Sequence, residues 1–142
     1  MHYTVDNSYR FLRNAEQQEK MVQLRDLKIF PDYSKIMMAS AIIGFKNGVY
    51  EEIKNRASDG VQLQFFTPED LDVIDLIAYA HKKDQKILRD KEKYHIFESY
   101  ANGGFPILYE KLGVNEDTTI DKREEILTKY YTLVKGKKGF IL

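Results

Sequence analysis

Residues 31–48 read Pro-Asp-Tyr-Ser-Lys-Ile-Met-Met-Ala-Ser-Ala-Ile-Ile-Gly-Phe-Lys-Asn-Gly, and this stretch decides the fold class of the 142-residue chain. At 100° per residue, the apolar side chains of 35–45 cover the whole circumference of a helix, which is typical of a central, buried helix. Asn47-Gly48 is a strong helix stop signal. We therefore predict a helix over about 34–45 that is nearly fully buried, with the other elements packed around it.

The segments before and after this helix are also patterned mainly for helices. Residues 8–25 place several apolar side chains on one side of a helix. Thr67-Pro68-Glu69-Asp70 is a well-specified helix start, with Thr67 as the N-cap, and that helix is expected to run to about 81. A turn and a short helix are expected over 82–93. Residues 61–65 alternate apolar and polar side chains and predict a short extended segment.

The second half of the chain predicts two more helical regions. A helix from about 91 is expected to stop at a sharp turn made by Asn102-Gly103-Gly104, with helical spacing resumed over 105–112. A last helix covers about 120–134 and is followed by a basic tail. The fold class is therefore mainly α, a compact bundle of five to six helices with at most one short extended segment.

We interpret residues 1–142 as one helical domain, with an N-terminal helix region over 1–28, a core over 29–112, and a C-terminal helix and basic tail over 118–142. The side chains expected in its core are Ile36, Met38, Ile42, Ile43, Phe45, Leu71, Ile74, Ile77, Phe97, Tyr100, Leu108, Leu127 and Tyr131.

Composition excludes several classes of protein. Hydrophobic residues are 43% and aromatic residues 13%, which is enough for a folded core. With Cys 0 there can be no disulfide framework, thiolate zinc site or cysteine nucleophile. The first residues have no signal-peptide pattern, and the longest apolar stretch is far shorter than the ~20 residues of a membrane span, so a cytoplasmic protein is expected, with no membrane partner.

The formal net charge is +0, from 22 Lys+Arg and 22 Asp+Glu, but the charge is zoned along the chain. Acidic residues dominate 59–80 and 96–125, and basic residues dominate 81–95 and 126–142. Flexible cations in such zones are the residues that contact phosphates. The candidate nucleic-acid-binding residues form three clusters: Arg10, Arg13 and Lys20; Lys82, Lys83, Lys86 and Arg89; and Lys135, Lys137 and Lys138.

The sequence contains one pattern that is typical of an enzyme. Pro31-Asp32 followed by Glu52-Ile53-Lys54 matches the PD-(D/E)xK nuclease pattern, in which carboxylates hold a divalent cation beside the scissile phosphate. The helical context favours a simple capping role for Asp32, and a metal-dependent nuclease using Asp32, Glu52 and Lys54 is kept as an alternative.

Other candidate sites are weaker. Asp72, Asp75 and Tyr79 share one helix face, where Asp75 is expected to pair with Lys82 or Lys83. The three histidines have no metal-ligand spacing. We therefore expect no catalytic residue, no metal and no cofactor, and a protein that is not an enzyme.

Residues 96–108, Ile-Phe-Glu-Ser-Tyr-Ala-Asn-Gly-Gly-Phe-Pro-Ile-Leu, resemble the IFEEYANGGLEIL block of the dnd system-associated, or DNA phosphorothioation-associated, protein 4 family. Residues 29–48 and 73–88 are similar to two further segments of that family, in the same order. Pro106 departs from the pattern, since an acidic helix former is usual there.

This resemblance implies an accessory role beside sulfur modification of the DNA backbone and the restriction system that reads it, an anti-phage function. The implied partners are double-stranded DNA and proteins of the phosphorothioation and restriction system. A protein-only adaptor or regulator stays open as an alternative, as does a homo-oligomer. The resemblance supplies no catalytic residues.

Overall fold

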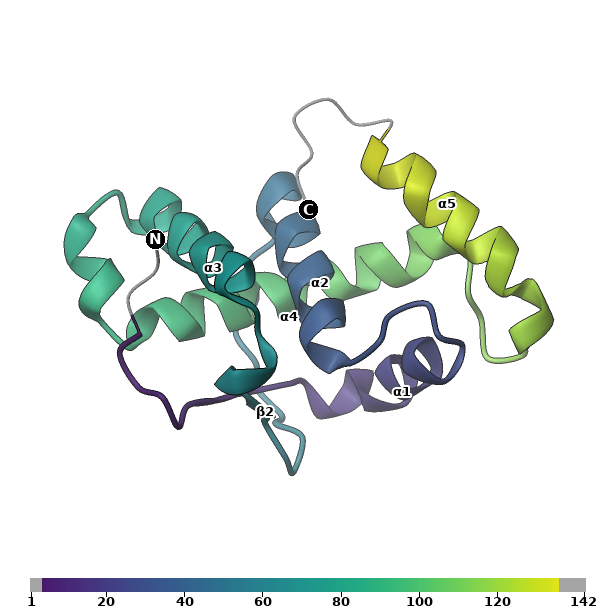
Figure 1. Cartoon of the computed structure of the whole chain (residues 1–142), viewed down its shortest axis with the longest axis horizontal. Coiled ribbons are helices and arrows are strands. Elements are labelled where there is room, and N and C mark those ends of the chain that lie inside the picture. The colour runs from purple at the N-terminus through teal and green to yellow at the C-terminus, as the bar shows by residue number, and fades with distance from the viewer. Residues whose placement is uncertain (1–3, 136–142) are drawn as a thin grey trace.

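The computed structural model describes residues 4–135 and confirms the predicted mainly helical fold (Figure 1). A small antiparallel sheet pairs β1 (Arg10–Phe11) with β2 (Val61–Gln62), so the extended segment expected over 61–65 is confirmed in its first two residues, while Leu63–Phe65 turns into a 3-10 helix. The α-helices of the described range are α1 (Gln18–Asp26), α2 (Tyr33–Asn47), α3 (Pro68–Lys82), α4 (Glu92–Leu112) and α5 (Arg123–Lys135). Short 3-10 helices occur at η1 (Ala15–Gln17), η2 (Leu63–Phe65), η3 (Gln85–Arg89) and η4 (Ile120–Lys122).

Helices α2 and α4 cross at the centre of the molecule, and each carries a glycine where they meet (Figure 1). A Cβ atom added to Gly104 would overlap the carbonyl oxygen of Ser40 and lie 2.6 Å from the backbone nitrogen of Gly44. A Cβ atom added to Gly44 would overlap the carbonyl oxygen of Tyr100. Only glycine lets the two backbones approach so closely, so these glycines set the distance between the central helices.

The turn predicted at Asn102-Gly103-Gly104 is wrong, because α4 continues through these residues and through Pro106 as one helix. The local turn signal is overridden by the helix crossing, which needs glycine for space rather than for a positive φ. Pro106 has no N–H to donate to the carbonyl of Asn102 one turn earlier. Gln17 Nε2 donates to that carbonyl instead, at 3.1 Å, so a tertiary contact satisfies the acceptor that proline leaves open.

Helix α2 is buried as predicted, except in its last turn. The Asp32 carboxylate caps its N-terminus by accepting from the backbone N–H of Lys35 at 3.2 Å, and Gly48, at φ 67°, closes its C-terminus. Ile36 and Ile43 are buried, and Ile42 is half-buried. The prediction that Phe45 lies in the core is wrong, since its side chain is 38% exposed on that last turn, where its ring meets that of Tyr100 edge to face.

The helix predicted over 8–25 is wrong in its first half, where the chain is extended and only α1 is regular helix. Phe11 is fully buried, and its ring lies against the rings of Tyr94, Phe66 and Phe97. The strand pair Phe11–Val61 holds it there. Burial of this aromatic ring through pairing with a distant segment outweighs the local helical spacing.

Helix α3 begins as predicted with Thr67 as its N-cap, and the structure shows that Thr67 and Asp70 form a capping box. The Thr67 hydroxyl accepts from the backbone N–H of Asp70 at 3.1 Å, and the Asp70 carboxylate accepts from the backbone N–H of Thr67 at 3.0 Å. Lys83, at φ 58°, ends the helix in the left-handed conformation. Gln85–Arg89 then forms the short 3-10 helix η3, in agreement with the turn and short helix predicted there.

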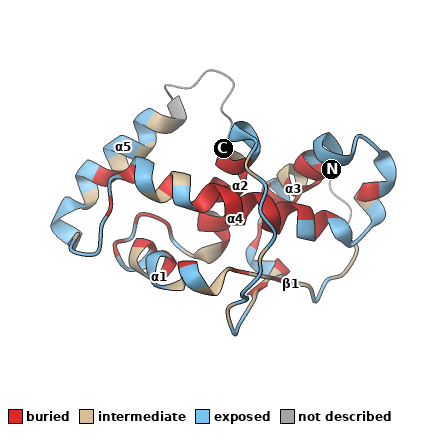
Figure 2. Cartoon of the chain, turned by 180° about the vertical axis from the view of Figure 1, so that it is seen from behind, coloured by how far each residue is buried: buried red, intermediate tan, exposed pale blue. Residues whose placement is uncertain are grey.

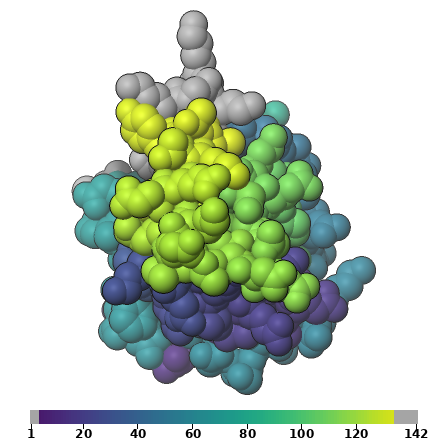
Figure 3. All heavy atoms as spheres, turned by 90° about the vertical axis from the view of Figure 1, so that its right-hand side faces the viewer, coloured from purple at the N-terminus to yellow at the C-terminus, as the bar shows by residue number. Residues whose placement is uncertain are grey.

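The core divides into two hydrophobic clusters that share α2 and α4, and Figure 2 shows that the middle of α4 is buried. One cluster includes α3 and the sheet, and the other includes α1 and α5. Seen from the right-hand side of Figure 1, α5 and the segment before it lie above α1, which stays visible below them (Figure 3). Ile126 anchors α5, and Leu127 is half-buried. The prediction that Tyr131 lies in the core is wrong, because it is 61% exposed on the outer side of the helix.

Candidate nucleic-acid interface

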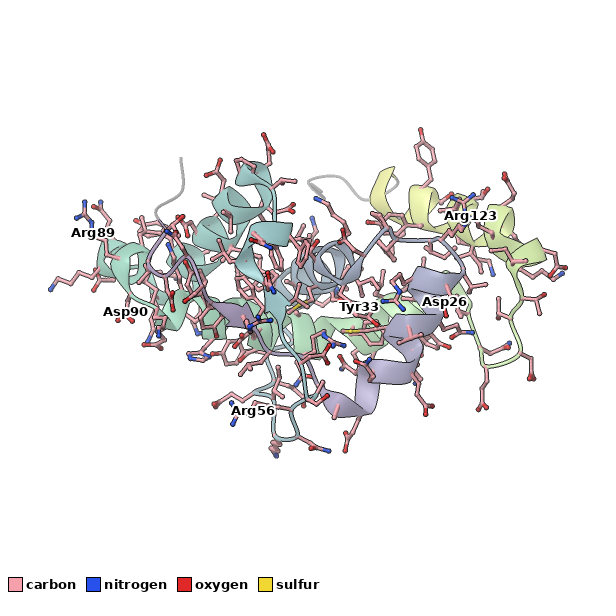
Figure 4. The ribbon with its side chains drawn as sticks, turned by 60° about the horizontal axis from the view of Figure 1, so that its bottom comes forward. Asp26, Tyr33, Arg56, Arg89, Asp90 and Arg123 are labelled. Carbon is pink, nitrogen blue, oxygen red and sulfur yellow. The ribbon has the colours of Figure 1, made fainter. Side chains whose placement is uncertain are left out.

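The cluster predicted at 82–89 is gathered at one end of the molecule, on the last turn of α3 and on η3. The Asp84 carboxylate caps η3 by accepting from the backbone N–H of Lys86 at 3.0 Å. In a 3-10 helix, residues three apart lie on the same face, so Lys86 and Arg89 share one face while Gln85 and Leu88 share another. Figure 4 shows Arg89 at one end of the molecule, with Asp26 and Arg123 toward the opposite end.

Ion pairs offset part of the positive charge at this end. Lys82 Nζ lies 3.1 Å from a carboxylate oxygen of Glu92, and Lys91 Nζ lies 3.6 Å from one of Asp6. All of these side chains except that of Asp6 are exposed, and such surface pairs contribute only about 0–1 kcal/mol, so a phosphate competes with them readily. The exposed cations that the structure brings together here are Lys82, Lys83, Lys86 and Arg89.

The first predicted cluster is not a common face. Arg13 is predicted on an exposed helix face, but it is 2% exposed and its guanidinium lies over the ring of Tyr33 at 4.4 Å. Its Nη2 lies 3.1 Å from the Asp59 carboxylate, and Nη1 donates to Gln18. Arg13 is therefore a buried structural cation that joins the N-terminal segment to the loop before β2.

The remaining predicted cations lie elsewhere. Arg10 is exposed on β1, and Lys20 is exposed on α1 with its ammonium 4.9 Å from the centre of the Tyr109 ring. Lys135 ends α5, and Lys137 and Lys138 lie outside the described residues. Contacts of these residues with nucleic acid stay predictions.

The nuclease constellation is not formed. Asp32 caps the N-terminus of α2, whereas Glu52 and Lys54 follow its C-terminus. Fifteen helical residues lie between the two sides of the motif, which is roughly 22 Å at 1.5 Å per residue, too far for shared metal ligands. Glu52 and Lys54 line a polar cleft of about 450 Å³ together with Asn14, Glu16 and Asn102 among others. The described residues contain no cluster of three or more His, Cys, Asp or Glu that could hold a metal ion.

The predicted pairing of Asp75 with Lys82 or Lys83 is wrong. Asp75 is buried, and its carboxylate lies 2.9 Å from Nζ of Lys93, which is 1% exposed. The same ammonium donates to the carbonyl of Leu88 at 2.8 Å. This buried ion pair joins α3, η3 and α4 just behind the basic end, and it fixes the position of η3.

A second buried carboxylate, Glu98, holds the N-terminal segment on α4. It accepts from the hydroxyl of Tyr9 at 2.8 Å and from the backbone N–H of Leu12 at 2.7 Å, and Nδ1 of His95 lies 2.9 Å from it. Burial raises the pKa of Glu98 above its usual value, although these three hydrogen bonds act in the opposite direction. Burial, followed by the Glu98 charge, raises the pKa of Tyr9.

Sequence reasoning missed the roles of Lys93 and Glu98. The only signal for Glu98 is its i, i+3 spacing from His95, and nothing in the local pattern distinguishes Lys93 from the exposed lysines around it. No helix of the described residues combines the length and the apolar character needed to cross a membrane.

One protein family matches the chain, over residues 11–134: DNA sulphur modification system-associated protein 4. The matched range runs from β1 to α5, so it includes the whole described core. No curated protein and no solved structure matches the chain.

Proposed function

The chain belongs to the DNA sulphur modification system-associated protein 4 family, and on this premise we propose that it is a non-enzymatic accessory protein of a bacterial DNA phosphorothioate modification and restriction system. It contacts duplex DNA through the basic end formed by Lys82, Lys83, Lys86 and Arg89. It works in the cytoplasm beside proteins of the same system, in defence against phage.

The observation that carries the DNA contact is the shared face of Lys86 and Arg89 on η3. One turn of a 3-10 helix rises about 6 Å, so the two cations stand next to each other at the exposed end of the molecule. Phosphates of one DNA strand are spaced about 3.4 Å along the duplex axis, so the pair spans about two phosphate steps. An arginine binds a phosphate through a planar fork, and a lysine binds it as a point charge.

The proposal is tested by the salt dependence of duplex binding. Each phosphate contact adds about −0.9 to the slope of log K against log salt, so four contacts lower the affinity roughly 150-fold between about 50 and 200 mM salt. Lys86→Glu/Arg89→Glu should reduce the loss over the same salt range to roughly 12-fold, because two contacts remain. Fluorescence anisotropy with a labelled duplex measures both slopes.

A matched control is Lys111→Glu/Lys122→Glu, which changes the net charge by the same amount at exposed positions on α4 and η4. The control should keep the wild-type slope. An equal reduction of the salt slope in the two double variants would show that net charge alone drives binding. An unchanged slope in Lys86→Glu/Arg89→Glu would eliminate the proposed face. Running sulfur-modified and unmodified duplexes side by side shows whether the modification is distinguished.

A second candidate is a protein-only adaptor, which the pairing of Lys82 with Glu92 and of Lys91 with Asp6 favours because it lowers the positive charge available to DNA. This candidate predicts no duplex binding even at about 50 mM salt, where phosphate contacts are strongest. It also predicts that the tagged chain co-purifies with modification or restriction proteins after nuclease treatment of the lysate.

A further inference from the structure

Helix α3 presents an unusual stripe to solvent. At 100° per residue, the side chains opposite its buried face are Glu69, Asp72, Val73, Leu76, Tyr79 and Ala80, followed by Lys83 at the C-cap; Asp72 and Val73 are half-buried, and the others are exposed. Leu76 is 66% exposed and Tyr79 is 43% exposed, although the opposite side of the helix already supplies its buried face. A bulky apolar centre on the outer side of an amphipathic helix indicates a covered surface.

The stripe is also polarised in charge. Its N-terminal end carries Glu69 and Asp72, and its C-terminal end carries Lys83, next to Lys82. Glu69 and Lys83 are both exposed, and neither has a salt-bridge partner within residues 4–135. The sequence of properties along the helix is therefore acidic, apolar, basic.

We infer that this stripe is the contact surface of a homodimer, in which α3 of one copy packs antiparallel against α3 of a second copy. An isologous contact requires a patch that is complementary to itself when reversed, and an acidic-apolar-basic stripe has this property. The dimer shares Lys83 with the proposed DNA contact, whereas Lys86 and Arg89 lie on the other face of η3 and are not part of the stripe.

The residue spacing defines the register. Placing the two-fold axis at Leu76 puts Glu69, seven residues before it, opposite Lys83 of the second copy, seven residues after it. Each lies about 10.5 Å from the axis along the helix, so two equivalent ion pairs form. Tyr79 of one copy, three residues after Leu76, faces Val73 of the other copy, three residues before it. The two Leu76 side chains meet at the axis. No like charges are opposed in this register.

A groove beside the stripe supplies the space that helix packing requires. It measures about 480 Å³ and is lined by Asp72, Asp75, Leu76, Tyr79, Gln85 and Leu88. Side chains of one helix pack into hollows between side chains of the other, and this groove offers such a hollow between α3 and η3. The buried ion pair of Asp75 with Lys93 holds the floor of the groove in place.

The inference is tested by the molar mass in solution, measured by sedimentation equilibrium on the full chain. Wild-type protein should show twice the 16.7 kDa of one chain at low salt, and raised salt should weaken the dimer. Glu69→Lys and Lys83→Glu should each weaken dimerisation by at least about 10-fold, because each opposes two pairs of like charges. Leu76→Glu should give a folded monomer, since the side chain is already exposed in one chain.

Mixing the Glu69→Lys and Lys83→Glu variants tests the antiparallel register directly. In a mixed dimer, position 69 of the Glu69→Lys copy faces position 83 of the Lys83→Glu copy, so opposite charges meet there with their signs exchanged. At the other end of the stripe, the native Lys83 of the first copy faces the native Glu69 of the second. Recovery of the dimer on mixing, and in the Glu69→Lys/Lys83→Glu double variant, supports the antiparallel register. Lys122→Glu is the control for net charge and should leave the dimer intact.

Three results would overturn the inference. One is a wild-type chain that stays monomeric at about 200 μM, a concentration at which an interface with a micromolar dissociation constant is almost fully formed. Another is a dimer that the single variants leave unchanged or that mixing does not restore. The third is capture of a different protein by a monomeric chain through Leu76, since the stripe would then belong to a heterologous partner.

Discussion

Gly104→Ala tests whether the crossing of α2 and α4 governs stability. In a helix with free space, alanine is about 1 kcal/mol better than glycine. At Gly104 the new Cβ would overlap the carbonyl oxygen of Ser40 and lie 2.6 Å from the nitrogen of Gly44, and both are backbone atoms. A backbone cannot rotate aside, so α2 must retreat from α4. Overpacking costs about 1–3 kcal/mol, and at the upper limit the net loss after the gain in helix propensity is about 2 kcal/mol.

Urea unfolding followed by far-ultraviolet circular dichroism measures this loss. With a slope of about 2 kcal/mol/M, the midpoint should fall by about 1 M. Gly48→Ala is the control, because no atom lies within 4 Å of its added Cβ and only the left-handed conformation at φ 67° is strained, at a cost of about 1 kcal/mol. A Gly104→Ala protein as stable as wild type, or more stable, would refute the close-packing account.

Three further substitutions probe the capped and buried polar groups. Burial raises the pKa of Glu98 in the folded state, so its ionisation reduces stability as the pH rises through and above its usual pKa. The stability of Glu98→Gln relative to wild type should therefore improve between about pH 4 and 7, as measured by urea unfolding at both pH values. A stability difference that is the same at both pH values would contradict this. Lys93→Met removes the buried cation beside Asp75 and should lower the free energy of unfolding by about 3–5 kcal/mol, which lowers Tm by roughly 10–17 °C in calorimetry. Asp75→Leu/Lys93→Met should recover most of that loss. Thr67→Ala should lower the free energy of unfolding by about 1 kcal/mol, because the capping box is lost. Thr67→Ser keeps the hydroxyl group and should retain most of that stability.

Elements whose signals are local could be predicted from the sequence. The apolar circumference of 35–45 predicted α2, the Thr67 cap predicted the start of α3, and the spacing of 120–134 predicted a last helix, which the structure divides into η4 and α5. Helix caps and hydrophobic periodicity depend on residues within one or two turns, so they predict these helices without knowledge of distant contacts. The basic end at 82–89 was predictable for the same reason, since its cations are close together along the chain.

Elements that depend on distant partners could not be predicted in this way. Phe11 is extended because Val61 pairs with it, and Gly104 is helical because α2 crosses it. The sequence around Arg13 and Lys93 does not distinguish them from surface cations. Their structural role comes from their ion-pair partners, Asp59 and Asp75, which lie on other segments. Local patterns carry no information about which polar side chain will meet a carboxylate from another element.

The hydrogen bonds to Glu98 and Asn102 have a consequence for how the molecule opens. These residues are one turn apart on α4, and together they bind Tyr9, Leu12, Asn14 and Gln17 from the N-terminal side. Asn102 also donates to the carbonyl of Glu51, in the loop after α2. A single helical turn is thus the anchor of two separate segments. Amide protons of both segments should therefore exchange with solvent as one cooperative unit, at a free energy below that of global unfolding.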